Sequence, residues 1–290
     1  MPRSYKAAAI QFQCVTGKNA WKHNTEKALH YLHQAVQQDA KLIVLPEGFD
    51  YGYNLDRTEL TEIQESSSTV ALLQSFARDH QVTIAAGIFE REATRFYNRS
   101  VIINELGVVA KYTKIHLFKS APMWENQTFC DGAERVMVRL KIDSVGLLIC
   151  YDLRFPELAR SLVLDGATTL LLSSAWPLAR KEHMEALAKV RAIENQVFLI
   201  SANQVGKNAK SLEFAGSSAI YDPLGNILAQ APQDREAIIT AEINPNKIFE
   251  VRNFMNCLGH RMPKTYHGLE NADNARHQPI QVDGRVNEIA

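Results

Sequence analysis

The stretch of sequence that decides the fold is VGLLICYDLRFPE, residues 145–157. Its apolar first half predicts a buried strand that runs straight into Cys150, and Pro156 suits the first turn of a following helix. Functional groups of open α/β sheets gather at the carboxyl ends of strands. Backbone N–H groups near a helix N-terminus can lower the pKa of a thiol and bind an oxyanion. A free cysteine is more often a small buried hydrophobic residue than a reactive group. This segment alone does not decide between these two roles for Cys150.

The chain on both sides of this stretch alternates between strand-like and helix-like patterns. Apolar runs predict strands at residues 5–14, 41–45, 82–89, 168–174 and 196–203. Helical spacing of apolar residues predicts helices at residues 19–38 and 181–195. A third helix is expected to begin at a cap within residues 66–68 and to end at residue 80, and a fourth is expected to follow residue 155. Short strand pairs are expected at 100–103 with 108–112, 135–140 with 144–149, and 216–221 with 227–229. This order predicts one α/β domain over residues 1–266.

The last part of the chain differs in composition from the rest. Residues 267–290 are polar and hold few apolar side chains. We expect this tail to be disordered. The alternative is an arm that lies across a partner subunit.

Composition excludes several classes of protein. The chain has 290 residues, 46% hydrophobic and 22% charged, which is neither collagen-like nor typical of disorder. Its 32 basic residues balance 32 acidic ones, which argues against a general binder of nucleic-acid backbones. The longest apolar runs are strand-sized and too short to cross a bilayer. We therefore expect a cytoplasmic protein that binds neither nucleic acid nor membrane.

The sequence offers no support for a metal or a cofactor. Its four cysteines are widely spaced and form neither a disulfide framework nor a zinc pattern: Cys14, Cys130, Cys150 and Cys257. Motifs for dinucleotides, P-loop phosphates, zinc proteases and serine hydrolases are absent from the sequence. We expect the chemistry to rest on side chains alone.

Two other predicted strands end in a charged residue. Leu42-Ile43-Val44-Leu45-Pro46 leads into Glu47, whose pKa burial would raise toward a value useful for proton transfer. Lys114 follows the predicted strand at 108–112. Taken singly, each is more simply a surface residue at the end of a strand. His116 could form a dyad with Cys150, but a hydrogen-bonded scaffold residue is the simpler interpretation.

Taken together, these segments resemble the nitrilase superfamily of carbon–nitrogen hydrolases. The resemblance covers the chain from its first strand to about Tyr266 and rests on Leu45-Pro46-Glu47, Lys114-Ile115-His116-Leu117-Phe118, the stretch from Cys150 to Glu157, and Arg191-Ala192-Ile193-Glu194-Asn195. It implies a four-layer α-β-β-α sandwich. It also implies a homodimer or a higher homo-oligomer.

The resemblance further implies a set of catalytic roles. Cys150 would attack a carbonyl or nitrile carbon, and Glu47 would take and return protons. Lys114 and the backbone N–H of Tyr151 would stabilise the oxyanion. Glu125 lies seven residues before Gly132, as a further active-site glutamate of the family does, and would orient Lys114 and water. A surface-loop glutamate is the alternative for Glu125.

The sequence also resembles one branch of the superfamily more than others. Tyr151-Asp152 after the cysteine and the segment Ala175-Trp176-Pro177 are similar to omega-amidases of the bacterial type, which implies a small amide of a carboxylic or 2-oxo acid. Trp176 and Tyr151 are expected at the substrate. Met184 departs from the pattern, since a tryptophan commonly stands there, and the departure leaves the substrate open.

Arg154 is the candidate partner for the acid group of the substrate. A guanidinium matches the two oxygens of a carboxylate, and family members that act on such amides have a basic residue here. The alternative is a structural ion pair of Arg154 with Asp152 or Glu157. Other activities also stay open: another amide, an N-carbamoyl compound or a nitrile as substrate, acyl transfer to an amine, or binding without catalysis.

Overall fold

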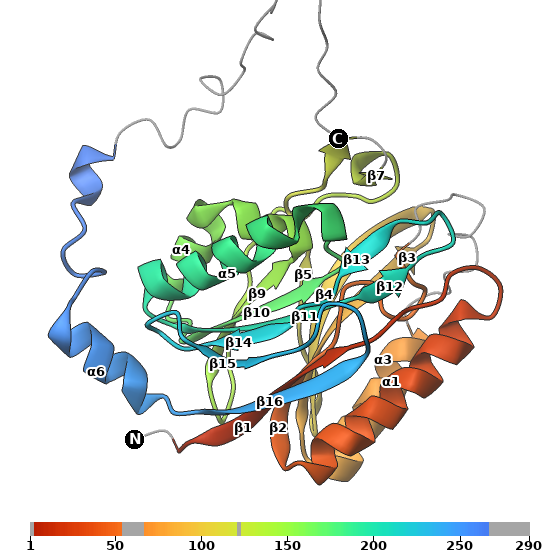
Figure 1. The fold of residues 1–290 in the computed structure, drawn as a ribbon, viewed down its shortest axis with the longest axis horizontal. Helices are drawn as coiled ribbons and strands as arrows, with labels where there is room; N and C mark the ends of the chain where they lie inside the picture. Colours follow the sequence, from red (N-terminus) through yellow and green to blue (C-terminus); the bar gives the residue numbers. More distant parts are fainter. Residues whose placement is uncertain (1–2, 54–66, 121–122, 267–290) are drawn as a thin grey trace, which may run out of the picture.

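The computed structural model describes residues 3–53, 67–120 and 123–266. Two six-stranded sheets pack face to face, and helices cover the outer face of each sheet (Figure 1). The layers therefore follow the order helix, sheet, sheet, helix. The predicted four-layer sandwich is confirmed.

The first sheet has the strand order β16-β1-β2-β3-β4-β5. Its strands are β1 (Tyr5–Gln11), β2 (Ala40–Val44), β3 (Thr83–Glu92), β4 (Arg95–Asn104), β5 (Gly107–Thr113) and β16 (Ala237–Ile243). Strands β1, β2 and β3 are parallel, whereas β4 and β5 continue the sheet as antiparallel neighbours. Helices α1 (Ala20–Gln37) and α3 (Ser67–His80) pack on its outer face. Because β5 runs in the same direction as β2, the residues that follow these two strands lie at the same edge.

The second sheet has the strand order β15-β14-β11-β10-β9-β8. Its strands are β8 (Met137–Arg139), β9 (Ser144–Ile149), β10 (Thr169–Ser174), β11 (Phe198–Asn203), β14 (Ala219–Tyr221) and β15 (Ile227–Gln230). The central strands β9, β10 and β11 are parallel. Helices α4 (Pro156–Leu164) and α5 (Lys181–Asn195) cover its outer face. Two small hairpins, β6 (Lys119–Ser120) with β7 (Met123–Trp124) and β12 (Val205–Lys207) with β13 (Glu213–Ala215), complete the strands.

The alternation of side chains along β1 shows how one strand serves two cores. Ala7 and Ala9 belong to the core between the sheets, whereas Ala8 and Ile10 belong to the core under α1 and α3. Successive side chains of a strand point to opposite faces, so a strand buried on both faces is apolar throughout. This is why the central strands read as continuous apolar runs.

The predicted elements are confirmed with shifts at their ends, and several elements escape prediction. Helix α5 spans the predicted residues, whereas β4 begins at Arg95, well before the predicted residue 100. The charged start of β4 hides the strand, because Arg99 is satisfied there by ion pairs with Glu90 and Glu92. Strand β16, the hairpin β12–β13 and helix α6 (Asn246–Phe254) lack a prediction. Each is short or lies at an edge, where the apolar pattern is weak.

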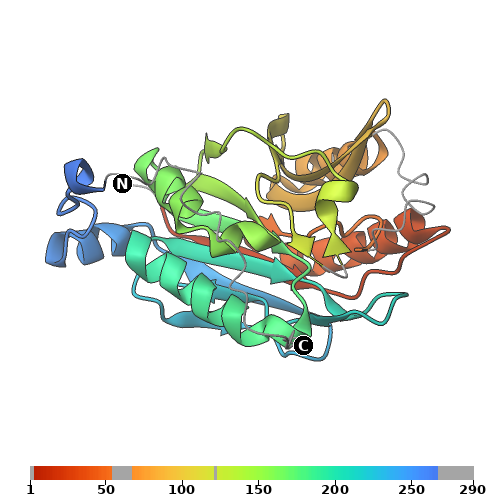
Figure 2. The same ribbon diagram turned by 90° about the horizontal axis from the view of Figure 1, so that it is seen from above.

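Helix α6 and the residues up to 266 extend from one end of the sandwich (Figures 1 and 2). The predicted tail, residues 267–290, and the predicted cap at Ser66 lie outside the described residues. In the described ranges, no helix is both long and apolar enough to cross a membrane.

Candidate active site

Cys150 stands at a sharp turn between strand and helix. Strand β9 ends at Ile149, and a 3-10 helix, η2 (Cys150–Arg154), follows at once and leads to Pro156, the first residue of α4. Cys150 is buried and has a φ of 43°, in the left-handed region that residues other than glycine rarely adopt. Such strain persists where the surrounding structure holds it, and it is concentrated at functional sites.

Glu47 follows β2 and is completely buried, so the surface-turn alternative is wrong. Its backbone N–H donates to the Ser174 carbonyl at 3.3 Å, which joins the two sheets at this point. Its carboxylate accepts hydrogen bonds from Asn98 Nδ2 at 2.6 Å and from the Ala175 N–H at 2.8 Å. A Cβ at Gly87 would lie 2.5 Å from the Glu47 Cα, so only glycine on β3 lets this loop pack so closely.

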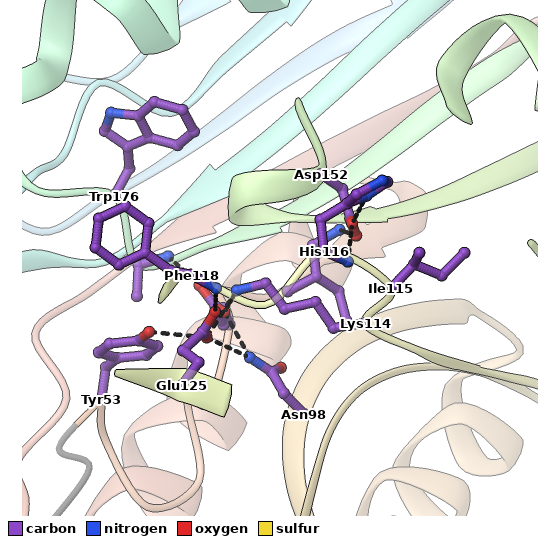
Figure 3. Close-up of polar contacts among 12 residues, drawn as sticks. Tyr53, Asn98, Lys114, Ile115, His116, Phe118, Glu125, Asp152 and Trp176 are labelled. Carbon is purple, nitrogen blue, oxygen red and sulfur yellow. Dashed lines mark hydrogen bonds and ion pairs between the residues drawn. The ribbon is translucent and has the colours of Figure 1, made fainter. Parts of the chain in front are cut away.

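Lys114 and Glu125 complete a buried cluster with Glu47. Lys114 Nζ lies 2.8 Å from Glu47 Oε1. It also lies 2.8 Å from Glu125 Oε1 (Figure 3). Glu125 begins the short 3-10 helix η1 (Glu125–Gln127) and accepts further hydrogen bonds from the Tyr53 hydroxyl at 2.8 Å and the Phe118 N–H at 2.7 Å. Both Lys114 and Glu125 are buried. The alternatives, an exposed lysine at the end of a strand and a glutamate in a surface loop, are therefore wrong.

The electrostatics of the cluster determine where its protons lie. Burial would lower the pKa of Lys114, but the carboxylates of Glu125 and Glu47 outweigh it and raise that pKa, so the ammonium stays charged. Burial raises the pKa of the Glu47 carboxyl, and Lys114 opposes the rise. Burial and the charge of Glu47 also raise the pKa of the Cys150 thiol. Burial and a neighbouring carboxylate, rather than the N–H groups of the following helix, therefore set the direction of this pKa.

A cavity of about 70 Å³ opens onto this cluster. Its lining includes Lys114, Cys150, Tyr151, Arg154, Trp176 and Arg180. The sequence-predicted residues Lys114, Cys150, Tyr151, Arg154 and Trp176 are therefore brought together around one space. Glu47 and Glu125 lie behind it, where both hold Lys114. Arg180, a second guanidinium at this cavity, was not singled out from the sequence.

Arg154 lies over aromatic rings rather than beside a carboxylate. Its guanidinium carbon is 4.7 Å from the Trp176 ring centre and 5.9 Å from that of Tyr151. Within the three described ranges, no carboxylate oxygen approaches Arg154 closely enough for an ion pair. The alternative pairing of Arg154 with Asp152 or Glu157 is therefore wrong, and the guanidinium faces the cavity.

Comparison with known proteins gives the family. The model of the carbon-nitrogen hydrolase family matches residues 6–253. The chain belongs to this family. It is 35% identical to a 2-oxoglutaramate amidase of Bacillus subtilis, over 84% of the chain and 93% of the relative. It is 36% identical to a deaminated glutathione amidase of Synechocystis, over 90% of the chain and 99% of the relative.

A solved structure agrees with this assignment. The carbon-nitrogen hydrolase of Helicobacter pylori superposes with a TM-score of 0.84 at 25% identity, over 91% of this chain and 97% of the other. The chain's membership of the nitrilase superfamily, inferred from its motifs, is confirmed. In the described part of this carbon–nitrogen hydrolase, no group of three or more His, Cys, Asp or Glu side chains is arranged to hold a metal ion.

Asp152 supports the Cys150 turn of this carbon–nitrogen hydrolase from within. Its carboxylate is buried and accepts hydrogen bonds from the Tyr112 hydroxyl at 2.7 Å, the Ile149 N–H at 2.9 Å, and both the N–H (3.1 Å) and Nδ1 (2.8 Å) of His116. The His116 ring also stacks on Phe155 at 3.6 Å. His116 is thus a scaffold residue, as expected, and its ring bonds to Asp152 rather than forming a dyad with Cys150.

Removal of the Asp152 carboxylate should destabilise the fold. The Asp152→Ala variant leaves several buried donors without an acceptor, so we expect its free energy of unfolding to fall by about 3 kcal/mol or more. Urea unfolding measures this loss. The neighbouring Glu157 is exposed, and Glu157→Ala should change the free energy by less than about 0.5 kcal/mol. Equal stability of the two variants would contradict the role of Asp152.

Proposed function

We propose that this protein hydrolyses the amide of a small carboxylic or 2-oxo acid, with Cys150 as nucleophile. The observation that carries the proposal is the buried cluster in which Lys114 Nζ joins Glu47 and Glu125 beside a cavity that Cys150 lines. A general base, a fixed cation and a nucleophile are the groups that acyl transfer from an amide requires.

In the first half of the proposed reaction, Glu47 accepts the thiol proton and the Cys150 sulfur attacks the amide carbon. A resting thiol with a raised pKa needs such a base, because the neutral sulfur is a poor nucleophile. The oxyanion that forms is stabilised by the Lys114 ammonium and the Tyr151 backbone N–H. Collapse of this intermediate breaks the C–N bond, Glu47 gives its proton to the leaving ammonia, and a thioester remains.

In the second half, Glu47 removes a proton from water, which attacks the thioester. The acid product leaves and the thiol is restored. Glu125 keeps Lys114 in place throughout, since it shares the ammonium with Glu47 and is itself held by Tyr53 and Phe118. An ammonium bound between two carboxylates is already oriented before the oxyanion forms, which is the arrangement that lowers the barrier most.

The substrate is proposed to carry a carboxylate that Arg154 binds. Trp176 and Tyr151 form the adjacent wall, and their rings hold the guanidinium over the cavity. The relatives named 2-oxoglutaramate amidase and deaminated glutathione amidase are almost equally similar to this chain, so identity does not choose between their substrates. Met184 is buried in the core and is not among the residues that line the cavity.

A screen for released ammonia tests the proposal. We expect activity on 2-oxoglutaramate and 2-oxosuccinamate, and less on glutamine, deaminated glutathione, N-carbamoyl amino acids and simple nitriles. The 2-oxo acid amides are favoured because Arg154 at the cavity can bind their carboxylate. If only the carbamoyl compounds or only the nitriles release ammonia, that class, and not the amides, is the substrate class of this protein. No release from any compound would favour a binding protein, and product analysis with added hydroxylamine separates hydrolysis from acyl transfer.

We also propose that the protein is a cytoplasmic homodimer. Large apolar side chains are exposed on α5, on α6 and on the residues that follow α6, among them Ile193, Phe249, Phe254 and Met262. Large apolar side chains that are exposed in one protomer can be covered by a second copy of the chain. Light scattering of the purified protein gives the number of subunits.

A further inference from the structure

Ser174 lies beside Cys150 at the carboxyl ends of two paired strands. Strands β9 and β10 are parallel, and Ile149 pairs with Ser173. The next residue on each strand is therefore Cys150 on one side and Ser174 on the other. Ser174 is completely buried, and its backbone carbonyl accepts the N–H groups of Glu47 at 3.3 Å and Gln204 at 3.1 Å. The backbone of Ser174 thus holds the proposed base while its side chain lies near the proposed nucleophile.

The hydroxyl oxygen of Ser174 is buried without a hydrogen-bond partner among the described residues, like those of Thr16 and Ser201. Of the three, only Ser174 lies next to Cys150 on the paired strands β9 and β10. In the part of the chain that the structure describes, no atom, sulfur included, accepts or donates a hydrogen bond at Ser174 Oγ. The neighbouring Ser173 differs, since its hydroxyl donates to the Leu45 carbonyl at 2.8 Å. A buried hydroxyl without a partner is unfavourable, and such groups in native proteins are few. A role in a second state of the site accounts for its presence.

The second state is the ionised sulfur. Burial and the charge of Glu47 raise the pKa of the Cys150 thiol, and a hydrogen bond from the neighbouring Ser174 hydroxyl to the sulfur would act against this rise. Hydrogen bonds to an ionised acceptor are stronger than those to a neutral one. The hydroxyl is therefore best satisfied when the sulfur has lost its proton.

We propose that Ser174 is a further catalytic residue, whose hydroxyl donates a hydrogen bond to the Cys150 thiolate. The proton of the thiol passes to Glu47, the electron pair stays on sulfur, and Ser174 keeps its own proton throughout. The inference rests on the proposed function, because it gives Ser174 a part in making the nucleophile. The other ionisable groups that act on Cys150 come from separate segments and are unchanged by substitution of Ser174: Glu47, Lys114, Glu125 and Tyr53.

The test is the Ser174→Ala variant, compared with wild type in two assays. Below its pKa, the thiolate fraction of a cysteine falls tenfold for each unit by which the pKa rises. We expect alkylation of Cys150 by iodoacetamide at pH 8, followed by peptide mapping, to slow by about ten- to a hundredfold. The kcat on the best amide should fall by a similar factor. The melting temperature should not fall, because the lost hydroxyl has no nitrogen or oxygen partner in the folded protein.

The matched control is Ser173→Ala, which removes a hydroxyl with a hydrogen bond inside the same strand. We expect this variant to lose thermal stability and to keep the alkylation rate of Cys150 within about twofold of wild type. If Ser174→Ala alkylates at the wild-type rate, or loses activity only together with stability, the proposed role of Ser174 is overturned. A different result is that alkylation slows in Ser174→Ala but a fully alkylated protein still hydrolyses amides. This result would contradict the role of Cys150 as nucleophile and would still support the hydrogen bond from Ser174 to the Cys150 sulfur.

Discussion

Replacing Cys150 with alanine should abolish the release of ammonia, with a loss in kcat of about a thousandfold or more on the best amide. The thiol is small and lines the cavity, so the variant should fold and melt as the wild type does. Without sulfur, no thioester forms, and the ammonium of Lys114 has no oxyanion to stabilise. Steady-state assays with purified variant and wild type measure the loss.

Companion substitutions make this prediction specific. Glu47→Gln and Lys114→Ala should each cause a loss of at least about a hundredfold, and the losses should not multiply in a double variant, because the groups act as a unit. Cys130→Ala is the matched control, since this cysteine is partly exposed and does not line the cavity. Intact-mass analysis of a quenched reaction should show an acyl adduct, and peptide mapping should place it on Cys150. Near-normal activity of Cys150→Ala would end the proposed mechanism.

The strand ends explain why so much of this site was open to prediction. Parallel strands bring their carboxyl ends to one edge, so charged residues that follow apolar runs, such as Glu47 and Lys114, are expected to meet. The turn at Cys150 is also predictable from the sequence, because an apolar strand is followed by the cysteine and then by a proline that suits the start of a helix. These signals are local in the sequence, and the fold only has to place the strands side by side.

The residues that escaped prediction act through contacts between distant segments. Asn98 lies inside β4 and Tyr53 lies in the loop after Glu47, yet both hold the carboxylates of the cluster. Asn98 precedes residue 100, where the predicted strand begins, so the sequence carries no signal for its place in β4. The direction of the Cys150 pKa likewise follows from burial and from the neighbouring Glu47 carboxylate, neither of which the local sequence shows. Burial of this kind comes from the packing of two sheets, which no short segment encodes.

Loss of the Arg154 guanidinium should separate acid-bearing amides from neutral ones. For Arg154→Ala we expect kcat/KM on a 2-oxo acid amide to fall by about thirtyfold to several thousandfold, which corresponds to about 2–5 kcal/mol. The reason is that a carboxylate in the cavity would lose its charged partner. A neutral amide of similar size has no such partner to lose, so its kcat/KM should stay within about threefold of wild type.

The surroundings of Arg154 make this contrast a strong one. In the described part of the chain the guanidinium has no carboxylate partner and lies over Trp176, so its charge is available to a ligand. Arg154→Lys is the informative second variant, because it keeps the charge and loses the two-pronged geometry, and an intermediate loss is expected. Equal losses on the acid and the neutral amide, with a lower melting temperature, would make Arg154 a structural residue. In that case Arg180, the other guanidinium at the cavity, becomes the residue to replace next.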